Sequence, residues 1–113
     1  MTIDMLTSYG ANTKEGLQRC MNNESFYLRL IKMIPGDVHF QSLYDAIEAG
    51  DLTAAFEAAH ALKGSTGNLA LTPIFAPVSE ITELLRVRTN MDYTPLIEAI
   101  RDSQNRLQEI CAD

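Results

Sequence analysis

Apolar residues recur with the period of an α-helix along most of this chain, and no segment shows the alternation typical of a β-strand. The sequence therefore predicts an all-α fold. We expect an antiparallel up-down four-helix bundle with short additional N-terminal helices packed on it, forming a single domain over residues 1–113. The additional helices would lie within 1–35, and the bundle would span about 37–111, with long helices at roughly 37–49, 52–70, 74–89 and 95–111.

The same spacing predicts which side chains form the core. Each predicted stripe would face the centre of the bundle or the surface on which a short helix packs. The stripes are Phe26, Leu30, Met33 and Ile34; Phe40, Leu43, Tyr44 and Ile47; Ala55, Ala58, Ala59, Leu62, Thr66 and Leu69; Ile74, Val78, Ile81 and Leu85; and Leu96, Ile97, Ile100, Leu107 and Ile110.

Capping residues mark the ends of several predicted helices. Asn12 and Glu15 have the spacing of a capping box, and Asp37 and Asp51 are good N-cap residues. Gly50 suits the position after a helix C-terminus. The tight joint between Gly50 and Asp51 predicts that the first two long helices fold back on each other.

Prolines mark two further helix starts. Thr72-Pro73 and Thr94-Pro95 are each expected as an N-cap and first-turn pair. Pro77 predicts either a kink in the third long helix or a later start for it, because proline has no backbone N–H to donate.

Charge and hydropathy exclude several kinds of partner. The chain has a net charge of −6, a pI near 4.8 and 46% hydrophobic residues. This acidic balance argues against nucleic-acid binding and against a basic membrane-surface helix. No apolar run approaches the roughly 20 residues that cross a bilayer, and the N-terminus lacks a secretory signal pattern. We therefore expect a cytoplasmic protein in which Cys20 and Cys111 are free thiols.

The segment AHALKGSTGNLAL, residues 59–71, places two helix-weakening glycines near a histidine. On a helical projection, His60 lies about 140° from the centre of the core stripe. Gly64 lies opposite the core, Gly67 lies beside His60, and Lys63 lies on the flank. Because glycine costs a helix about 1 kcal/mol relative to alanine, we interpret both glycines as clearing the outer surface around an exposed imidazole.

An exposed histidine beside a lysine suits phosphoryl transfer. Near pH 7 a large share of histidine side chains carries no charge, so one ring nitrogen can act as a nucleophile. Lys63 would neutralise the charge of the phosphoryl group. His39, which lies beside the Asp37 cap without accompanying groups, is interpreted as an ordinary histidine.

No carboxylate cluster suited to Mg²⁺ is evident, and no glycine-rich phosphate loop occurs. We therefore expect no cofactor, no metal and no kinase or ATPase activity on this chain. Any Mg²⁺ would be held by the partner.

The stretch HALKGSTGNLAL resembles the signature of histidine phosphotransfer (HPt) domains, the phosphocarriers of two-component phosphorelays, and the preceding GDLTAAFEAA is similar to the approach to that signature. The resemblance implies a monomer that passes a phosphoryl group between receiver-domain aspartates. Its partners would be a response-regulator receiver domain and/or a hybrid sensor histidine kinase. The matching residues are His60, Leu62, Lys63, Gly64, Ser65 and Leu69.

This resemblance implies a role for each matching polar or glycine position. His60 would carry the phosphoryl group as phosphohistidine, Lys63 would stabilise it, and Gly64 would let a receiver domain approach closely. Ala70 stands where the family usually has glycine. Thr82 stands where many members have a glutamine that hydrogen-bonds the imidazole, and it would reach the ring only through water.

Three further residues are secondary candidates. Gly67 would help to expose the imidazole. Arg86 would add positive potential or be an ordinary solvated arginine, and Phe56 would offer an apolar docking contact or be a plain core residue.

Two other functions fit fewer features. A degenerate HPt-like helical adaptor would bind a receiver-like partner without chemistry, but the retention of both His60 and Lys63 argues against it. A metal-binding bundle is disfavoured because the two histidines, His39 and His60, lie far apart in the sequence. Both a free-standing protein and a domain of a larger hybrid kinase fit the chain.

Overall fold

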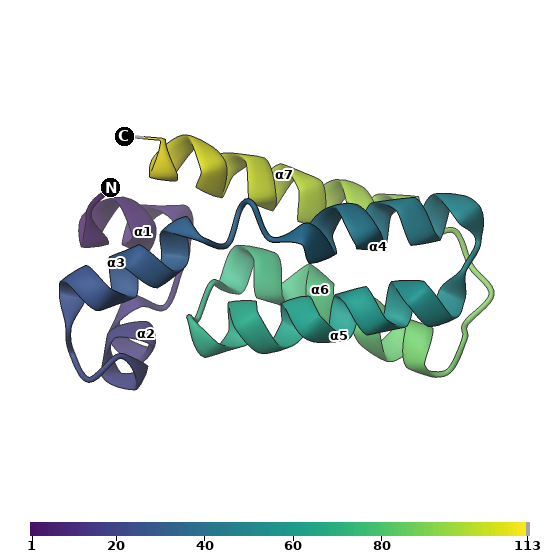
Figure 1. Ribbon diagram of the computed structural model, residues 1–113, viewed down its shortest axis with the longest axis horizontal. Coiled ribbons are helices and arrows are strands. Elements are labelled where there is room, and N and C mark those ends of the chain that lie inside the picture. Colours follow the sequence, from purple (N-terminus) through teal and green to yellow (C-terminus); the bar gives the residue numbers. More distant parts are fainter. Residues whose placement is uncertain (113) are drawn as a thin grey trace.

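A computed structural model describes residues 1–112 of the chain, and its regular elements are all helical (Figure 1). This confirms the predicted all-α fold. The helices are α1 (Ile3–Tyr9), α2 (Thr13–Arg19), α3 (Glu24–Lys32), α4 (Val38–Ala49), α5 (Leu52–Asn68), α6 (Thr72–Arg86) and α7 (Thr94–Cys111).

The four long helices α4 to α7 form the predicted bundle. The α4–α5 and α6–α7 connections lie at one end, and the α5–α6 connection lies at the other, beside α1 to α3 (Figure 1). No helix within residues 1–112 is both long and apolar enough to cross a membrane.

The turn between α4 and α5 has the predicted chemistry. Gly50 adopts a left-handed conformation with φ 73°, and the N–H of Asp51 donates to the carbonyl of Ala46 over 2.9 Å. The Asp51 side chain then accepts from the N–H of Ala54 over 3.0 Å. This joint makes α4 and α5 antiparallel neighbours.

The proline-containing helix starts differ from the prediction by one residue. Leu71 and Tyr93 occupy the N-cap positions and make no side-chain cap hydrogen bond, so Thr72 and Thr94 are the first helical residues. The following prolines fit there because the first-turn N–H groups have no helical partner. Pro77 lies inside α6, so the later-start alternative is wrong.

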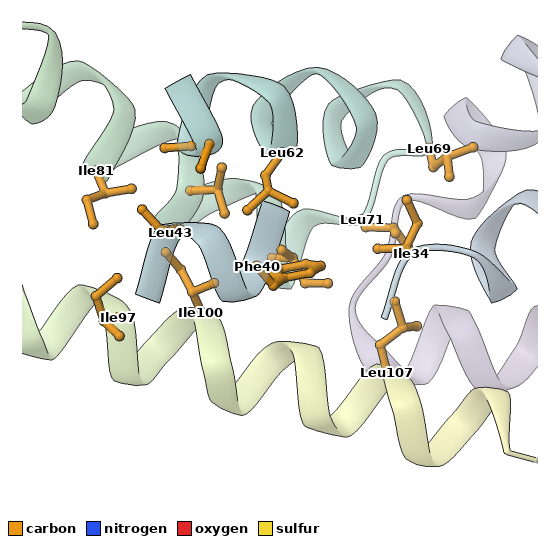
Figure 2. Packing of buried hydrophobic residues seen from close by; sticks show 14 of the residues in the cluster. Ile34, Phe40, Leu43, Leu62, Leu69, Leu71, Ile81, Ile97, Ile100 and Leu107 are labelled. Atoms are coloured by element: carbon orange, nitrogen blue, oxygen red, sulfur yellow. The ribbon is translucent and has the colours of Figure 1, made fainter. Parts of the chain in front are cut away.

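Core side chains from four helices meet along the bundle axis. Leu62 of α5 points toward Phe40 and Leu43 of α4, with Ile100 of α7 beside them (Figure 2). The predicted stripes of α5 and α6 are buried throughout, as are Phe40, Leu43 and Tyr44 of α4. The stripes derived from the helical period therefore locate the core of the bundle correctly.

The predicted stripe at the short helix α3 was wrong at two of its four positions, because Ile34 is buried and Leu30 is partly buried against the core. Phe26 and Met33 are 40% and 67% exposed, whereas Tyr27 and Ile31 are fully buried. Both sets fit a helical period equally well. The buried set is selected by tertiary contact, because the Tyr27 hydroxyl donates to the carbonyl of Leu69 over 2.9 Å.

The N-terminal helices pack against the end of the bundle where α5 stops. Besides the Tyr27 bond, the N–H of Asn12 donates to the carbonyl of Ala70 over 2.9 Å. The Arg19 guanidinium donates to the carbonyl of Gly67. These donors satisfy carbonyl groups at or just beyond the α5 C-terminus, which an isolated helix leaves without partners.

Candidate functional site

His60 lies on the outer face of α5 with its side chain exposed. The residues on either side of it in the sequence differ in burial, since Ala59 is fully buried and Ala61 is only half-buried. Within residues 1–112, the imidazole takes part in no ion pair. The helix therefore turns this ring away from the bundle core, as the helical projection predicts.

The His60 ring stacks on Phe56, one turn earlier in α5. The two ring centroids are 5.7 Å apart and the ring planes are inclined by 16°. The guanidinium carbon of Arg86, on α6, lies 5.0 Å from the centroid of the Phe56 ring. Phe56 is half-buried, so it is both packed against the core and available to orient His60 and Arg86.

Lys63 and Arg86 share one carboxylate partner, Glu83 of α6. The Lys63 Nζ lies 3.3 Å from Glu83 Oε2. The Arg86 Nε and Nη2 donate to Glu83 Oε1 and Oε2, each over 3.3 Å. These bonds, that of Arg86 first and that of Lys63 second, lower the pKa of Glu83. The sequence pattern alone does not single out Glu83, although its spacing to Arg86 fits an i, i+3 ion pair.

Gly64 leaves open space beside the imidazole. A Cβ added to Gly64 would have no atom within 4 Å outside its own helix turn. The adjoining hollow has a volume of about 440 Å³, and its lining residues are His60, Lys63, Gly64, Gly67, Asn68 and Phe75. A group docked here would contact the imidazole, the lysine and an aromatic ring together.

The interpretation of Gly67 was wrong. A Cβ at Gly67 would lie 2.8 Å from a carbon of the Phe75 ring, so this glycine admits a side chain of α6 and does not simply clear the outer surface. Phe75, which the sequence reasoning missed, forms one wall of the hollow. Its place beside α5 depends on the packing of α6, which no local pattern reveals.

The expectation for Thr82 was also wrong. Thr82 is fully buried, and its hydroxyl donates to the carbonyl of Val78 over 2.6 Å. The helical period of α6 places it on the core face, next to Ile81 and Leu85, so it does not reach the imidazole through water. Glu83, the next residue, occupies the exposed edge of α6 instead.

Ala70 ends α5 in a left-handed conformation with φ 56°. The N–H of Leu71 donates to the carbonyl of Thr66, and that of Ala70 to the carbonyl of Gly67, which together form a Schellman motif. Glycine adopts this conformation without strain, which accounts for glycine being usual at this position of the signature.

The remaining candidates for metal or redox chemistry lie outside this region. Cys20 is buried and Cys111 is half-buried, and both are free thiols. Within residues 1–112, no three His, Cys, Asp or Glu side chains are grouped so as to hold a metal ion. His39 pairs with Asp37, its Nδ1 lying 2.7 Å from Asp37 Oδ1.

Comparison with known proteins identifies the family. The family model described as "Hpt domain" matches residues 36–111, which include the whole bundle from α4 to α7 and leave α1 to α3 outside. No curated protein and no solved structure matches the chain. Because the matched range covers more than half of the sequence, the chain belongs to the Hpt domain family.

Proposed function

We propose that this protein relays a phosphoryl group between receiver-domain aspartates of a two-component pathway, with His60 as the phosphorylated residue. The observation that carries the proposal is the exposed His60 imidazole beside the open position of Gly64, in a chain of the Hpt domain family. The stack on Phe56 would favour one orientation of the ring before the partner arrives.

The transfer step needs few groups from this chain. The unprotonated nitrogen of neutral His60 attacks the phosphorus of a receiver aspartyl phosphate. The N–P bond forms as the P–O bond to the aspartate breaks, and the carboxylate leaves with the electron pair. The other ring nitrogen keeps its hydrogen. The reverse step returns the phosphoryl group to a second aspartate.

The step requires that the charge of the phosphoryl group be neutralised and that the receiver come close to the ring, and Lys63 and Gly64 would meet these two requirements. Lys63, about one turn from His60 on α5, would neutralise charge on the phosphoryl oxygens. Gly64 would let the receiver backbone approach the ring. The hollow that these residues line would receive the phosphoryl group, and Mg²⁺ would stay on the receiver.

The partner surface extends beyond the hollow. An apolar groove of about 490 Å³ lies next to it and shares Asn68 with it. Two of its lining residues, Met33 and Val38, are strongly exposed. A receiver domain docked over both would bury apolar area around a polar reacting centre.

We further propose that the protein is a cytoplasmic monomer that binds a response-regulator receiver, a hybrid sensor kinase, or both.

Transfer of label tests the proposal. Receiver domains charged with acetyl phosphate are mixed with this protein, and acid-labile, base-stable label on the chain is measured. We expect wild type and His39→Gln to be labelled and His60→Gln to remain unlabelled. Label on His60→Gln would refute the assigned site. Binding of a receiver without any labelling of wild type would favour the adaptor function instead.

A further inference from the structure

The lysine that would neutralise the phosphoryl group is already paired in this structure. Its Nζ lies 3.3 Å from a carboxylate oxygen of Glu83, on the neighbouring helix. Lys63 lines the hollow, whereas Glu83 does not. The Lys63 side chain is 32% exposed and that of Glu83 is 53% exposed, so the pair is in contact with water. A negative charge is therefore fixed close to where a second negative group would be formed.

We propose that Glu83 is a positioning residue which holds Lys63 while His60 is unphosphorylated and yields it to the phosphoryl oxygens after transfer. This inference rests on the proposed function. The inference adds an exchange of counter-ions to the proposed transfer. The Lys63 ammonium leaves the Glu83 carboxylate for the phosphoryl group, and no covalent bond of Lys63 or Glu83 changes.

The strengths of the two interactions favour exchange. A water-exposed lysine–carboxylate pair is weak, because solvent screens it and two flexible side chains must be ordered. A phosphoryl group carries up to two negative charges and three acceptor oxygens, so it attracts the ammonium more strongly than a carboxylate does. Lys63 also starts from the same helix face as His60, which keeps the distance to be covered short.

Arg86 would remain as an ion-pair partner of Glu83 when Lys63 is released. Its two donors bind both carboxylate oxygens, so Glu83 stays paired after Lys63 has left. Arg86 is itself oriented over the Phe56 ring, which stacks on His60. The bonds to Arg86 would thus keep the carboxylate beside the position of Lys63 in both states, where its charge competes with the phosphoryl group for the ammonium.

The first test measures where the phosphoryl group rests at equilibrium. Phosphorylated protein is mixed with an unphosphorylated receiver, and label on each chain is read at the plateau. We expect Glu83→Gln to shift the ratio about two- to fivefold toward phosphohistidine, with a smaller shift at high salt. Glu80→Gln is the matched control: it removes the same charge from an exposed residue of α6, and Glu80 makes no ion pair within residues 1–112.

The second test needs no receiver. Potassium phosphoramidate transfers its phosphoryl group to histidine nitrogen with loss of ammonia, and ³¹P NMR then follows the titration of the phosphoryl group on the folded protein. We expect its midpoint to fall by about 0.3 to 0.7 pH units in Glu83→Gln, because freed Lys63 favours the dianion. It should rise in Lys63→Gln, and the further Glu83→Gln change should have less effect there.

Two results would overturn the inference. One is a Glu83→Gln protein whose equilibrium ratio and ³¹P midpoint match those of Glu80→Gln. The other is a shift of either quantity in the opposite direction. Failure of the proposed function is a separate result, since it would leave wild type unlabelled by any receiver or His60→Gln labelled.

Discussion

Gly64 and Gly67 occupy neighbouring turns of α5, but their surroundings differ. The space beside Gly64 is open, whereas the Phe75 ring fills the space beside Gly67. Residue identity alone therefore does not reveal what each glycine does. Substitution by alanine separates the two roles, since the added methyl group is the same in both cases.

We expect Gly64→Ala to raise the free energy of unfolding by about 0.5 to 1 kcal/mol, because alanine favours the helix and meets no atom. Gly67→Ala should lower it by about 1 kcal/mol, because displacing the Phe75 ring outweighs the gain in helix propensity. Urea unfolding followed by circular dichroism measures both values. Equal effects of the two variants would contradict this assignment, and a Phe75→Ala background should abolish the Gly67→Ala penalty.

A larger side chain at Gly64 tests the docking role. We expect Gly64→Gln to slow phosphoryl transfer from a receiver by about tenfold, because the new side chain projects into the space that the receiver must enter. The slowing with phosphoramidate, a small donor, should be much weaker. Rapid-quench labelling with each donor gives the two rates. Equal slowing with both donors would show that the substitution acts by changing the conformation of α5 and not by blocking the receiver.

At the scale of the element, the C-terminus of α5 depends on helices that precede the bundle in the sequence. Arg19 and Tyr27 donate to carbonyls near this terminus, and Asn12 donates to the residue just beyond it. Gly16 lets the Tyr27 ring approach, since a Cβ there would lie 2.4 Å from the Tyr27 hydroxyl oxygen. The helix that carries His60 is therefore held at its far end by α2 and α3.

Removing the Tyr27 hydroxyl tests this support. We expect Tyr27→Phe to lower the free energy of unfolding by about 1 to 2 kcal/mol, because the buried carbonyl of Leu69 loses its partner. Hydrogen exchange in α1 to α3 should become faster. Tyr93→Phe is the control: its hydroxyl bonds the nearby Thr89 carbonyl, so its loss should leave exchange in α1 to α3 unchanged.

At the scale of the whole molecule, buried tyrosines link the stability of the fold to alkaline pH. Burial raises the pKa of Tyr27 and of Tyr44 to about 12, and it raises that of Tyr9 as well. Their hydroxyls bond Leu69, Gln104 and Ser103 respectively, which connects the N-terminal helices and α4 to the rest of the molecule.

The sign of the pH dependence follows from these shifts. In the unfolded chain tyrosine loses its proton near pH 10, whereas in the folded protein it keeps it to higher pH. We therefore expect full stability below about pH 10 and a steady loss between about pH 10 and 12. Urea unfolding at increasing pH measures this loss. Tyr44→Phe should show a shallower decline than wild type, and an equal decline would contradict the assignment to Tyr44.

The sequence by itself determined the elements of the bundle and the outward direction of His60. Helical period, the Asp51 cap and the Gly50 turn are local properties, set by 3.6 residues per turn and by backbone conformation. They depend only on residues close to one another in the sequence, so they can be predicted without knowing the fold.

Only the tertiary structure decided which side chains meet across helices. It buried Thr82, packed Phe75 on Gly67 and joined Glu83 to Lys63. It also selected Tyr27 over Phe26 as the buried face of α3. These outcomes depend on the relative rotation and depth of two packed helices. A shift of one residue changes them while leaving the hydrophobic period of each helix nearly intact.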